Sequence, residues 1–493
     1  MNDSQRHGIF REIRKKMATN ISFKNEGCIY PIDRPEKGSH EHYWAVIKEG
    51  QQPRFLVKRQ IGYKKSEDGE AHEICFIDQE NTKNGAFLCE SGNKYNIIAK
   101  LAPINKEALD NPRNIKYFPW REDFINYLMV AILIANISPY FCYYYGSYVC
   151  KNADQYMFKN VNLIRRFKNQ SILMNAQKEI VSIGKKLSQL DIAYDEIESL
   201  MRKNKDLENA VEKKIKRNYG HGVYTAFMER GDKDLYGYLD VMSNITNETI
   251  YCLSFQILQA LIAMQETFDV MHMDLHLYNL LVTEHGNNKN NIAYNIFGHK
   301  FYVPLIGFDI RIIDFGRSLI AKHQKNEMLA NEAREQYELF NGTNSSFDFY
   351  KKVLNNLTRN RKYYIECFKS FDVLRVFNEL LAMLQSIAPK ESVNFLESIV
   401  NDATEDFEVN FTQRERKKGL IGTPLKILQN YYINKDLYTT KNDKKYTPLI
   451  DNGKEKVYSI NTKIIKTTKE TIKNKLLGPI QHGGGAARSP TPP

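Results

Sequence analysis

The sequence predicts an α+β protein in which strands and helices segregate along the chain. Apolar runs separated by polar turns, between about residues 74 and 100, are typical of strands. Residues from about 320 to 420 instead follow a helical pattern, and hydrophobic residues make up 42% of the 493-residue chain. A strand-rich segment followed by a helical one favours an α+β fold, and this apolar content is enough for a packed core.

The first elements follow in order along the chain. Residues 1 to about 75 contain no recognisable motif, and EICFID, AFLCE and KYNIIAKLA then predict strands. A helix is expected from about Arg121 to Asn136. Its apolar run, FINYLMVAILIANI, is too short to span a bilayer and is followed by Pro139, so a buried helix and no membrane association are expected. The aromatic segment PYFCYYYGSYVC predicts the next strand.

Residues 152–217 are charged and helical in pattern. Apolar residues alternate in spacings of three and four over three heptads, from Ile180 to Met201, with Gly184 inside the pattern. Two interpretations stay open: a helical arm for a partner or for self-association through residues 172–215, or a long helix packed on its own domain.

The second half alternates short strands with long helices. VYTAFMERG (223–231) predicts a buried strand and Ile250–Phe268 a helix, with short strands at Leu280–Val282 and Asp309–Ile313. The last residues are Lys-rich and end in GGGAARSPTPP, which is typical of a flexible tail.

Charge and cysteine content limit the classes of partner and compartment. The net charge of +12 and a pI near 9.0 favour anionic partners, or simply solubility. No aromatic platform accompanies the Lys-rich segment between Lys454 and Lys475, so no stable nucleic-acid partner is expected. The seven cysteines form no CxxC pair, which argues against a disulfide framework and a structural zinc site and favours a reducing compartment. The opening MNDSQRHGIF has no apolar core of a signal peptide.

Two short motifs carry the chemistry. MHMDLHLYNLLV (271–282) follows the predicted helix and leads into a strand, and IRIIDFGRS (310–318) places Asp314 at the end of another strand. Carboxylate and amide oxygens are the hard ligands that Mg²⁺ prefers. HMDLHLYN resembles the HRDLxxxN catalytic loop of protein kinases, and Asp314-Phe315-Gly316 resembles their metal-binding motif.

The resemblance implies a two-lobed fold that binds ATP and Mg²⁺ between its lobes. Asp274 would orient the acceptor hydroxyl and take its proton, while Asn279 and Asp314 would hold Mg²⁺. Lys100, at the end of an apolar strand, would contact the phosphates, and Glu122 on the next helix would pair with it. Asp123 competes with Glu122 for that position.

Further kinase parts are matched less closely. Met228, Glu229 and Arg230 would contact adenine, with Phe227 near the gatekeeper position. Gly85 matches the third glycine of the phosphate-covering GxGxxG loop, so the close backbone approach that glycines permit is reduced. The earlier stretch IGYKKSEDGEAH, with Gly62 and Gly69, is a weaker match to this loop.

Three other positions of the large lobe bear on the resemblance. Asp372 would hold the catalytic loop, or would cap a helix. Met273 replaces the usual Arg that binds an activation-loop phosphate, and His276 is shared with small-molecule phosphotransferases. No Ala-Pro-Glu signal follows the second motif.

A closer resemblance covers residues from about 76 to 430. NISPYFCYYYGSY, the insert after the catalytic loop and FYVPLIGFDIRIIDFGRS resemble the serine/threonine-kinase homologues of nucleocytoplasmic large DNA viruses. This resemblance implies a viral enzyme that acts in the host cytoplasm or in the virion. Without a viral origin, a cytoplasmic enzyme is expected.

These inferences define an expected domain organisation. An N-terminal extension (1–75) precedes a small lobe (76–230) with a helical insertion (152–217), followed by a large lobe (231–430) and a Lys-rich extension with a flexible tail (431–493). The preferred function is a kinase for Ser/Thr hydroxyls of protein substrates. The alternatives are a pseudokinase scaffold, favoured by the missing glycines, and a small-molecule kinase.

Overall fold

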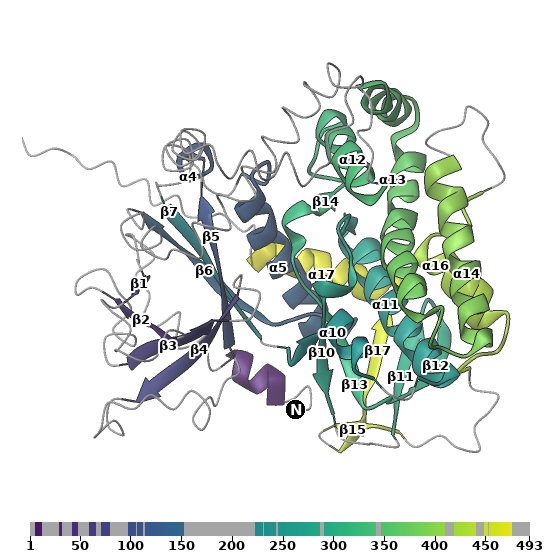
Figure 1. Ribbon diagram of the computed structural model, residues 1–493, viewed down its shortest axis with the longest axis horizontal. Coiled ribbons are helices and arrows are strands. Elements are labelled where there is room, and N and C mark those ends of the chain that lie inside the picture. The colour runs from purple at the N-terminus through teal and green to yellow at the C-terminus, as the bar shows by residue number, and fades with distance from the viewer. Residues whose placement is uncertain are drawn as a thin grey trace, which may run out of the picture. The chain divides into compact units, whose positions relative to one another are not determined.

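The computed structural model describes residues 5–11, 29–31, 42–47, 59–65, 71–78, 97–104, 106–111, 114–151, 222–229, 231–242, 245–285, 290–341, 347–409, 419–439, 448–451 and 453–475. The chain forms two compact units (Figure 1). The sheet unit comprises Arg6–Asp123 and Tyr143–Arg230; the helical unit comprises Met1–Gln5, Phe124–Cys142 and Gly231–Pro493. The mixture of helices and sheets confirms the predicted α+β class, while the two-lobed arrangement stays a prediction.

A seven-stranded antiparallel sheet dominates the sheet unit. Its order is β1-β2-β3-β4-β5-β7-β6. The strands are β1 (Ile29–Pro31), β2 (His42–Ile47), β3 (Arg59–Lys65), β4 (Ala71–Asp78), β5 (Ile97–Ile104), β6 (Tyr144–Lys151) and β7 (Gly222–Glu229). The strands predicted near 74–78, 94–102, 139–150 and 223–231 fall on β4, β5, β6 and β7. AFLCE (86–90) lies outside the described residues.

The sequence patterns do not predict β1, β2 and β3, and β3 shows one reason. The segment RQIGYKK of β3, for example, carries charged residues at both ends and a glycine in the middle. Strand register, rather than local propensity, identifies these residues as part of the sheet: Gly62 on β3 pairs with Cys75 on β4.

Two helices lie between β5 and β6 in sequence: α4 (Lys106–Asp110) and α5 (Phe118–Ile134). The predicted buried helix is confirmed, because Ile125, Met129 and Ile132 of α5 are almost completely buried. In the described part of the chain, no helix has the length and apolar character needed to cross a membrane.

Helix α11 (Asn247–Phe268) forms the core of the helical unit. The Thr246 hydroxyl accepts a hydrogen bond from the Thr249 amide at 3.1 Å and caps its first turn. Asp269, at φ 54°, ends the helix in the left-handed region. Nearly every residue between these caps is buried, as expected for a helix surrounded by other elements.

Four small sheets form within the described part of the helical unit. Their orders are β13-β10-β8, β12-β11-β17, β14-β9 and β15-β16. The strands are β8 (Lys233–Asp234), β9 (Val270–Met271), β10 (Leu280–Glu284), β11 (Asn291–Ile296), β12 (His299–Pro304), β13 (Phe308–Ile312), β14 (Leu319–Ile320), β15 (Ile450–Asp451), β16 (Lys454–Glu455) and β17 (Val457–Ile460). Phe297 and Gly298, both with positive φ, form the tight turn between β11 and β12.

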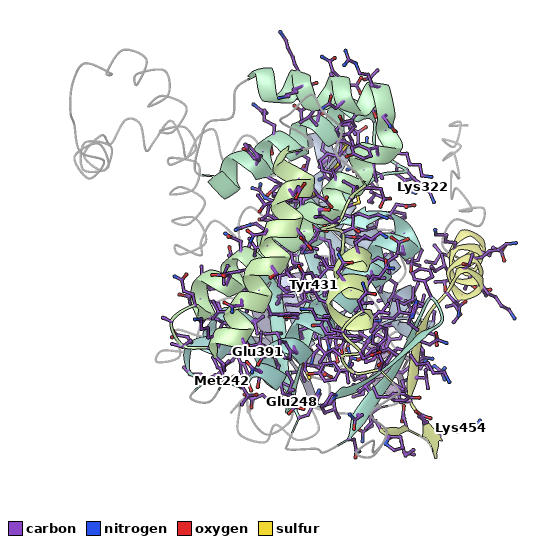
Figure 2. All side chains as sticks on the ribbon, turned by 90° about the vertical axis from the view of Figure 1, so that its right-hand side faces the viewer. Met242, Glu248, Lys322, Glu391, Tyr431 and Lys454 are labelled. Carbon is purple, nitrogen blue, oxygen red and sulfur yellow. The ribbon has the colours of Figure 1, made fainter. Side chains whose placement is uncertain are left out.

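The remaining helices complete the unit, and the helical pattern predicted for 320–420 falls on α12, α13 and α14. These helices are α10 (Leu235–Asp240), α12 (Asn326–Asn341), α13 (Phe347–Leu384, kinked at Asn360), α14 (Lys390–Thr404), the π-helix η4 (Glu405–Val409), α16 (Pro424–Leu428), the π-helix η5 (Gln429–Ile433) and α17 (Thr462–Lys475). In Figure 2, Glu248 and Glu391 mark the starts of α11 and α14, which lie side by side. The Asn247 side chain donates to Glu391 at 2.7 Å there.

The predicted domain boundaries stay predictions. One strand pairing nevertheless shows with which unit the residues near the C-terminus fold. Residues 448–475 fold with the helical unit, because β17 pairs in parallel with β11. The heptad pattern from Ile180 to Met201 and the end of the chain after residue 475 lie outside the described residues.

Candidate active site

Two strand pairs bring the predicted motifs together. The loop of residues 272–279 connects β9 to β10, and residues 313–318 connect β13 to β14. Strand β10 pairs with β13, and β9 pairs with β14. The two loops therefore begin and end beside each other. The 3-10 turns η2 (Leu277–Asn279) and η3 (Phe315–Arg317) lie within these loops.

Asn279 joins the two loops. Its Nδ2 atom donates to the Asp274 carbonyl at 2.9 Å, and its backbone carbonyl accepts the Ile313 amide at 3.0 Å. The Nδ2 atom also lies 3.1 Å from His276 Nε2. These bonds use the amide nitrogen, so the Oδ1 oxygen is the atom of this buried side chain suited to a cation.

His272 makes a second connection between the loops. Its Nε2 atom lies 2.8 Å from the Ile313 carbonyl, which can only accept, so Nε2 carries the proton. Burial lowers the pKa of this imidazole, which favours the neutral ring. The ring also packs against Phe315, with centroids 5.2 Å apart.

Asp314 adopts an unusual backbone conformation for a residue with a side chain. Its φ of 65° and ψ of 63° lie in the left-handed region, a conformation that costs about 1–3 kcal/mol and concentrates at functional sites. Phe315, directly after it, is buried and contacts Phe141 and His272. The buried phenylalanine therefore anchors the turn that presents the Asp314 carboxylate.

The Asp274 side chain is partly exposed, whereas Met273 and Leu275 on either side of it are buried. Its Oδ2 atom lies 3.6 Å from Arg317 Nε, and the two side chains are 23% and 40% exposed, respectively. A carboxylate that remains open to solvent can meet a hydroxyl-bearing substrate. Arg317, one position after Gly316, links it to the second motif.

One buried carboxylate holds the backbone at the start of the loop of residues 272–279. Asp372 Oδ2 accepts the His272 amide at 2.8 Å, and Oδ1 accepts the Met273 amide at 2.6 Å. Gln265 Nε2 donates to Oδ2 at 3.0 Å. Asp372 lies inside α13, so of the two predicted roles the loop-holding one is confirmed and helix capping is wrong. Burial raises the pKa of this carboxyl to about 7, and the three hydrogen bonds oppose that rise.

The structure clarifies the replacement at Met273. This residue has φ 66° and is completely buried, with its amide held by Asp372. No cationic side chain is therefore presented from this position toward a phosphate. An arginine would have to leave the buried environment in which methionine packs.

Two exposed tyrosines stack on each other, one within the loop of residues 272–279 and one on α10. Tyr278, adjacent to Asn279, stacks on Tyr236 of α10 with ring centroids 4.8 Å apart. Tyr278 is 54% exposed. Behind it, Glu379 accepts the Leu277 amide at 2.9 Å and pairs with Arg375 at 2.6 Å, which fixes the turn η2 from α13. The sequence motifs did not predict these positions, because the contacts come from distant segments.

Three of the candidate residues, Lys100, Glu122 and Asp123, belong to the sheet unit. Lys100 lies on β5, where its backbone faces Ala71 on β4 and Ala226 on β7. Glu122 is completely buried on α5. Its competitor Asp123 accepts hydrogen bonds from the hydroxyls of Tyr144 and Ser147. The pairing of Lys100 with Glu122 or with Asp123 stays a prediction.

The predicted adenine-contacting residues lie at the end of β7. Met228 is buried, and Glu229 bonds to Arg6 and to the Tyr143 amide. Arg230 and Gly85 lie outside the described residues, so their predicted roles stay predictions.

The donor set in the helical unit fits Mg²⁺ bound together with nucleotide phosphates. Asn279 and Asp314 offer an amide and a carboxylate oxygen, and Mg²⁺ typically takes one or two such ligands plus phosphates and water. Within the described ranges, no group of three or more His, Cys, Asp or Glu side chains could form a metal site by itself.

The comparisons with known proteins point to the kinase superfamily. No family model matches the chain. The chain is 25% identical over 242 residues to "Putative serine/threonine-protein kinase R400" of Acanthamoeba polyphaga mimivirus. The matched segment covers 45% of this chain and 47% of that protein. The chain thus spans about half the length of this curated relative.

Solved structures add one further comparison. The chain in "Crystal structure of Rad53 kinase domain and SCD2" is 13% identical, with a TM-score of 0.21, and the match covers 50% of this chain and 76% of that chain. The similarity to the mimivirus protein confirms the resemblance to the protein-kinase-like superfamily that residues 272–279 and 314–316 predicted.

Proposed function

We propose that this protein is an ATP-dependent phosphotransferase that acts as a kinase on Ser/Thr hydroxyls of proteins. The observation that carries the proposal is the joining of the two motif loops. Asn279 bonds to both Asp274 and Ile313, and Asp314 follows directly. The similarity to a mimivirus protein named as a serine/threonine kinase supports the same reaction and a viral origin. In that case the protein acts in the host cytoplasm or in the virion.

Each residue has a defined task in this proposal. Asp274 orients the acceptor hydroxyl and accepts its proton as the new oxygen–phosphorus bond forms and the bond to the ADP oxygen breaks. Asn279 Oδ1 and the Asp314 carboxylate would hold Mg²⁺, which would neutralise phosphate charge when bound. Lys100, paired with Glu122, would contact phosphates of ATP, as the kinase resemblance implies.

The buried contacts explain how the loops keep their geometry without an activation-loop phosphate. Asp372 fixes two backbone amides of the loop, and His272 ties the loop to Ile313. Phosphoryl transfer depends mainly on positioning and electrostatic stabilisation, so a pre-formed loop suits it. Because Met273 is buried, we propose that activity does not require an activation-loop phosphate bound by the residue at position 273.

The decisive experiment measures Mg²⁺-dependent transfer of radiolabelled phosphate from ATP to a generic basic protein. The wild type, Asp314→Asn and the control Asp110→Asn are compared, because Asp110 is exposed on α4. Transfer by the wild type and the control, but not by Asp314→Asn, is expected. ATP turnover with metabolites but not with proteins would favour a small-molecule kinase. Absence of both ATP binding and transfer in the wild type would favour the scaffold.

A further inference from the structure

A short helix of residues 5–11, drawn in purple in Figure 1, bonds to the last residue of β7. Arg6 donates from Nε to Glu229 Oε1 and from Nη2 to Oε2, both at 2.7 Å. The Arg6 side chain is 2% exposed and that of Glu229 is 15% exposed. Two parallel hydrogen bonds from one guanidinium give both strength and a fixed orientation.

Aromatic packing encloses this ion pair. The Arg6 guanidinium lies 5.1 Å from the centre of the Tyr143 ring, within the range of a cation–π contact. Phe10, one turn later on the same helix, stacks on Tyr143 with centroids 4.9 Å apart and is largely buried. The surrounding rings shield the pair from water, which strengthens it and makes either charge costly to leave alone.

Glu229 forms hydrogen bonds with both Arg6 and Tyr143. Besides the two bonds from Arg6, its Oε2 atom accepts the Tyr143 amide at 3.2 Å, and its own amide donates to the Tyr143 carbonyl at 2.8 Å. Tyr143 lies directly before β6, so Arg6 fixes the point where the ends of two neighbouring strands meet. These contacts all lie within the sheet unit.

We propose that Arg6 is a positioning residue for the nucleotide. This inference rests on the proposed function, in which Met228 and Glu229 begin the adenine-contacting stretch. Backbone groups can recognise adenine only if the chain holds them in place, and preorganisation reduces the entropy cost of binding. By clamping the Glu229 carboxylate, Arg6 keeps this strand end in its binding geometry. The helix of residues 5–11 thereby sets the affinity for ATP.

This role predicts a selective effect on the nucleotide. The Arg6→Ala variant should bind a fluorescent ATP analogue at least about tenfold more weakly and show a matching rise in the KM for ATP. The KM for the protein acceptor should stay the same, because the proposed function assigns the acceptor to Asp274 and adenine to the end of β7. Without nucleotide, the amides of residues 222–229 should exchange faster with solvent in this variant.

Matched variants separate positioning from general stabilisation. Arg11→Ala removes an exposed arginine from the same helix and should leave the affinity unchanged. Arg6→Lys keeps the charge but loses the bidentate geometry, so an intermediate affinity is expected, and this variant is informative even if Arg6→Ala does not fold. The exchanged pair Arg6→Glu with Glu229→Arg should recover part of the affinity lost in Arg6→Ala.

The outcomes distinguish this inference from the proposed function. If the wild type binds no ATP analogue, the proposed function fails and the inference fails with it. If the wild type binds and Arg6→Ala binds equally well, the inference alone is overturned. Equal losses in Arg6→Ala and Arg11→Ala would also overturn it, because the ion pair would then carry no specific effect.

Discussion

Asp372 shows how one buried residue can organise a site without touching a substrate. Its two carboxylate oxygens accept the amides of His272 and Met273, next to Asp274. The same carboxyl has a pKa raised to about 7 by burial. The ionised carboxylate accepts the loop hydrogen bonds more strongly, but burial in the core makes its charge unfavourable. The pH decides which form is present and therefore which of these two effects is larger.

We predict that Asp372 makes the stability of the protein depend on pH. Because the folded-state pKa is raised, the stabilising effect of protonation is complete below the unfolded pKa, near 4, and is lost as pH rises through about 7. Compared with Asp372→Asn, the wild type should lose about 2–3 kcal/mol of unfolding free energy between pH 5 and pH 8. Urea unfolding of both proteins at the two pH values measures this difference.

The kinetics of the same variant test the positioning role. An asparagine amide offers one acceptor and one donor group, so it cannot accept both loop amides as the carboxylate does. The kcat of Asp372→Asn should therefore fall, by about 10- to 100-fold, while its affinity for ATP changes little. A pH-independent stability difference combined with unchanged kcat would contradict both parts of the argument.

The contrast between Asp274 and its supporting residues explains what the sequence could predict. Asp274, Asn279 and Asp314 stand out because they lie within two short segments that resemble kinase motifs. Their carboxylate and amide groups are the types that phosphoryl transfer requires. The supporting bonds from Gln265 and Glu379 join segments about a hundred positions apart. No local pattern marks such partners, because a buried glutamine inside an apolar helix has the same sequence signature as an exposed one.

At the scale of elements, α11 connects neighbours through buried glutamines. Gln256 donates to the Phe308 carbonyl at 3.3 Å and accepts the Ile310 amide at 3.0 Å, so it binds two backbone groups on one edge of strand β13. Gln259 likewise donates to the Ile137 carbonyl at 2.7 Å. The strand that Gln256 supports continues into Asp314, so this helix contributes to the position of the second motif.

We expect Gln256→Leu to destabilise the protein and to weaken catalysis together. Leucine has a similar size but leaves two buried backbone groups of β13 unpaired, at a cost of about 1–3 kcal/mol each. Urea unfolding and kcat report the two effects. The control Gln385→Leu changes an exposed glutamine just after α13 and should alter unfolding by no more than about 0.5 kcal/mol. Equal stability of the two variants would exclude the bridging role.

The elements themselves differed in how well the sequence predicted them. Long periodic segments such as α5 and α11 were expected nearly where they lie, because an apolar run of that length has few alternatives. Strand β17 was not expected, because its four residues, VYSI, gain a partner only by pairing with β11 far back in the chain. Pairing across such a distance leaves no trace in local composition.

At the scale of the whole helical unit, residues 448–475 connect back to the core around the site. Tyr458 on β17 stacks on Tyr294 on β11, with centroids 5.6 Å apart. The Tyr294 hydroxyl is hydrogen-bonded to the Tyr140 hydroxyl, and the Tyr140 carbonyl accepts the Ile312 amide at 3.0 Å. Three tyrosines therefore lead from the Lys-rich segment to the strand that ends just before Asp314.

This arrangement predicts that the Lys-rich segment is an integral part of the fold. Tyr458 is 3% exposed, so Tyr458→Ala should leave a cavity and cost about 3–5 kcal/mol. Hydrogen exchange should show loss of protection at the β11 amides that pair with β17, and kcat should fall because support for Tyr294 is lost. The neighbouring Val457, which is 40% exposed, supplies the control: Val457→Ala should cost about 1 kcal/mol or less. If Tyr458→Ala were as stable and as protected as Val457→Ala, the segment would be an appendage, and its lysines would have to be explained by a partner instead.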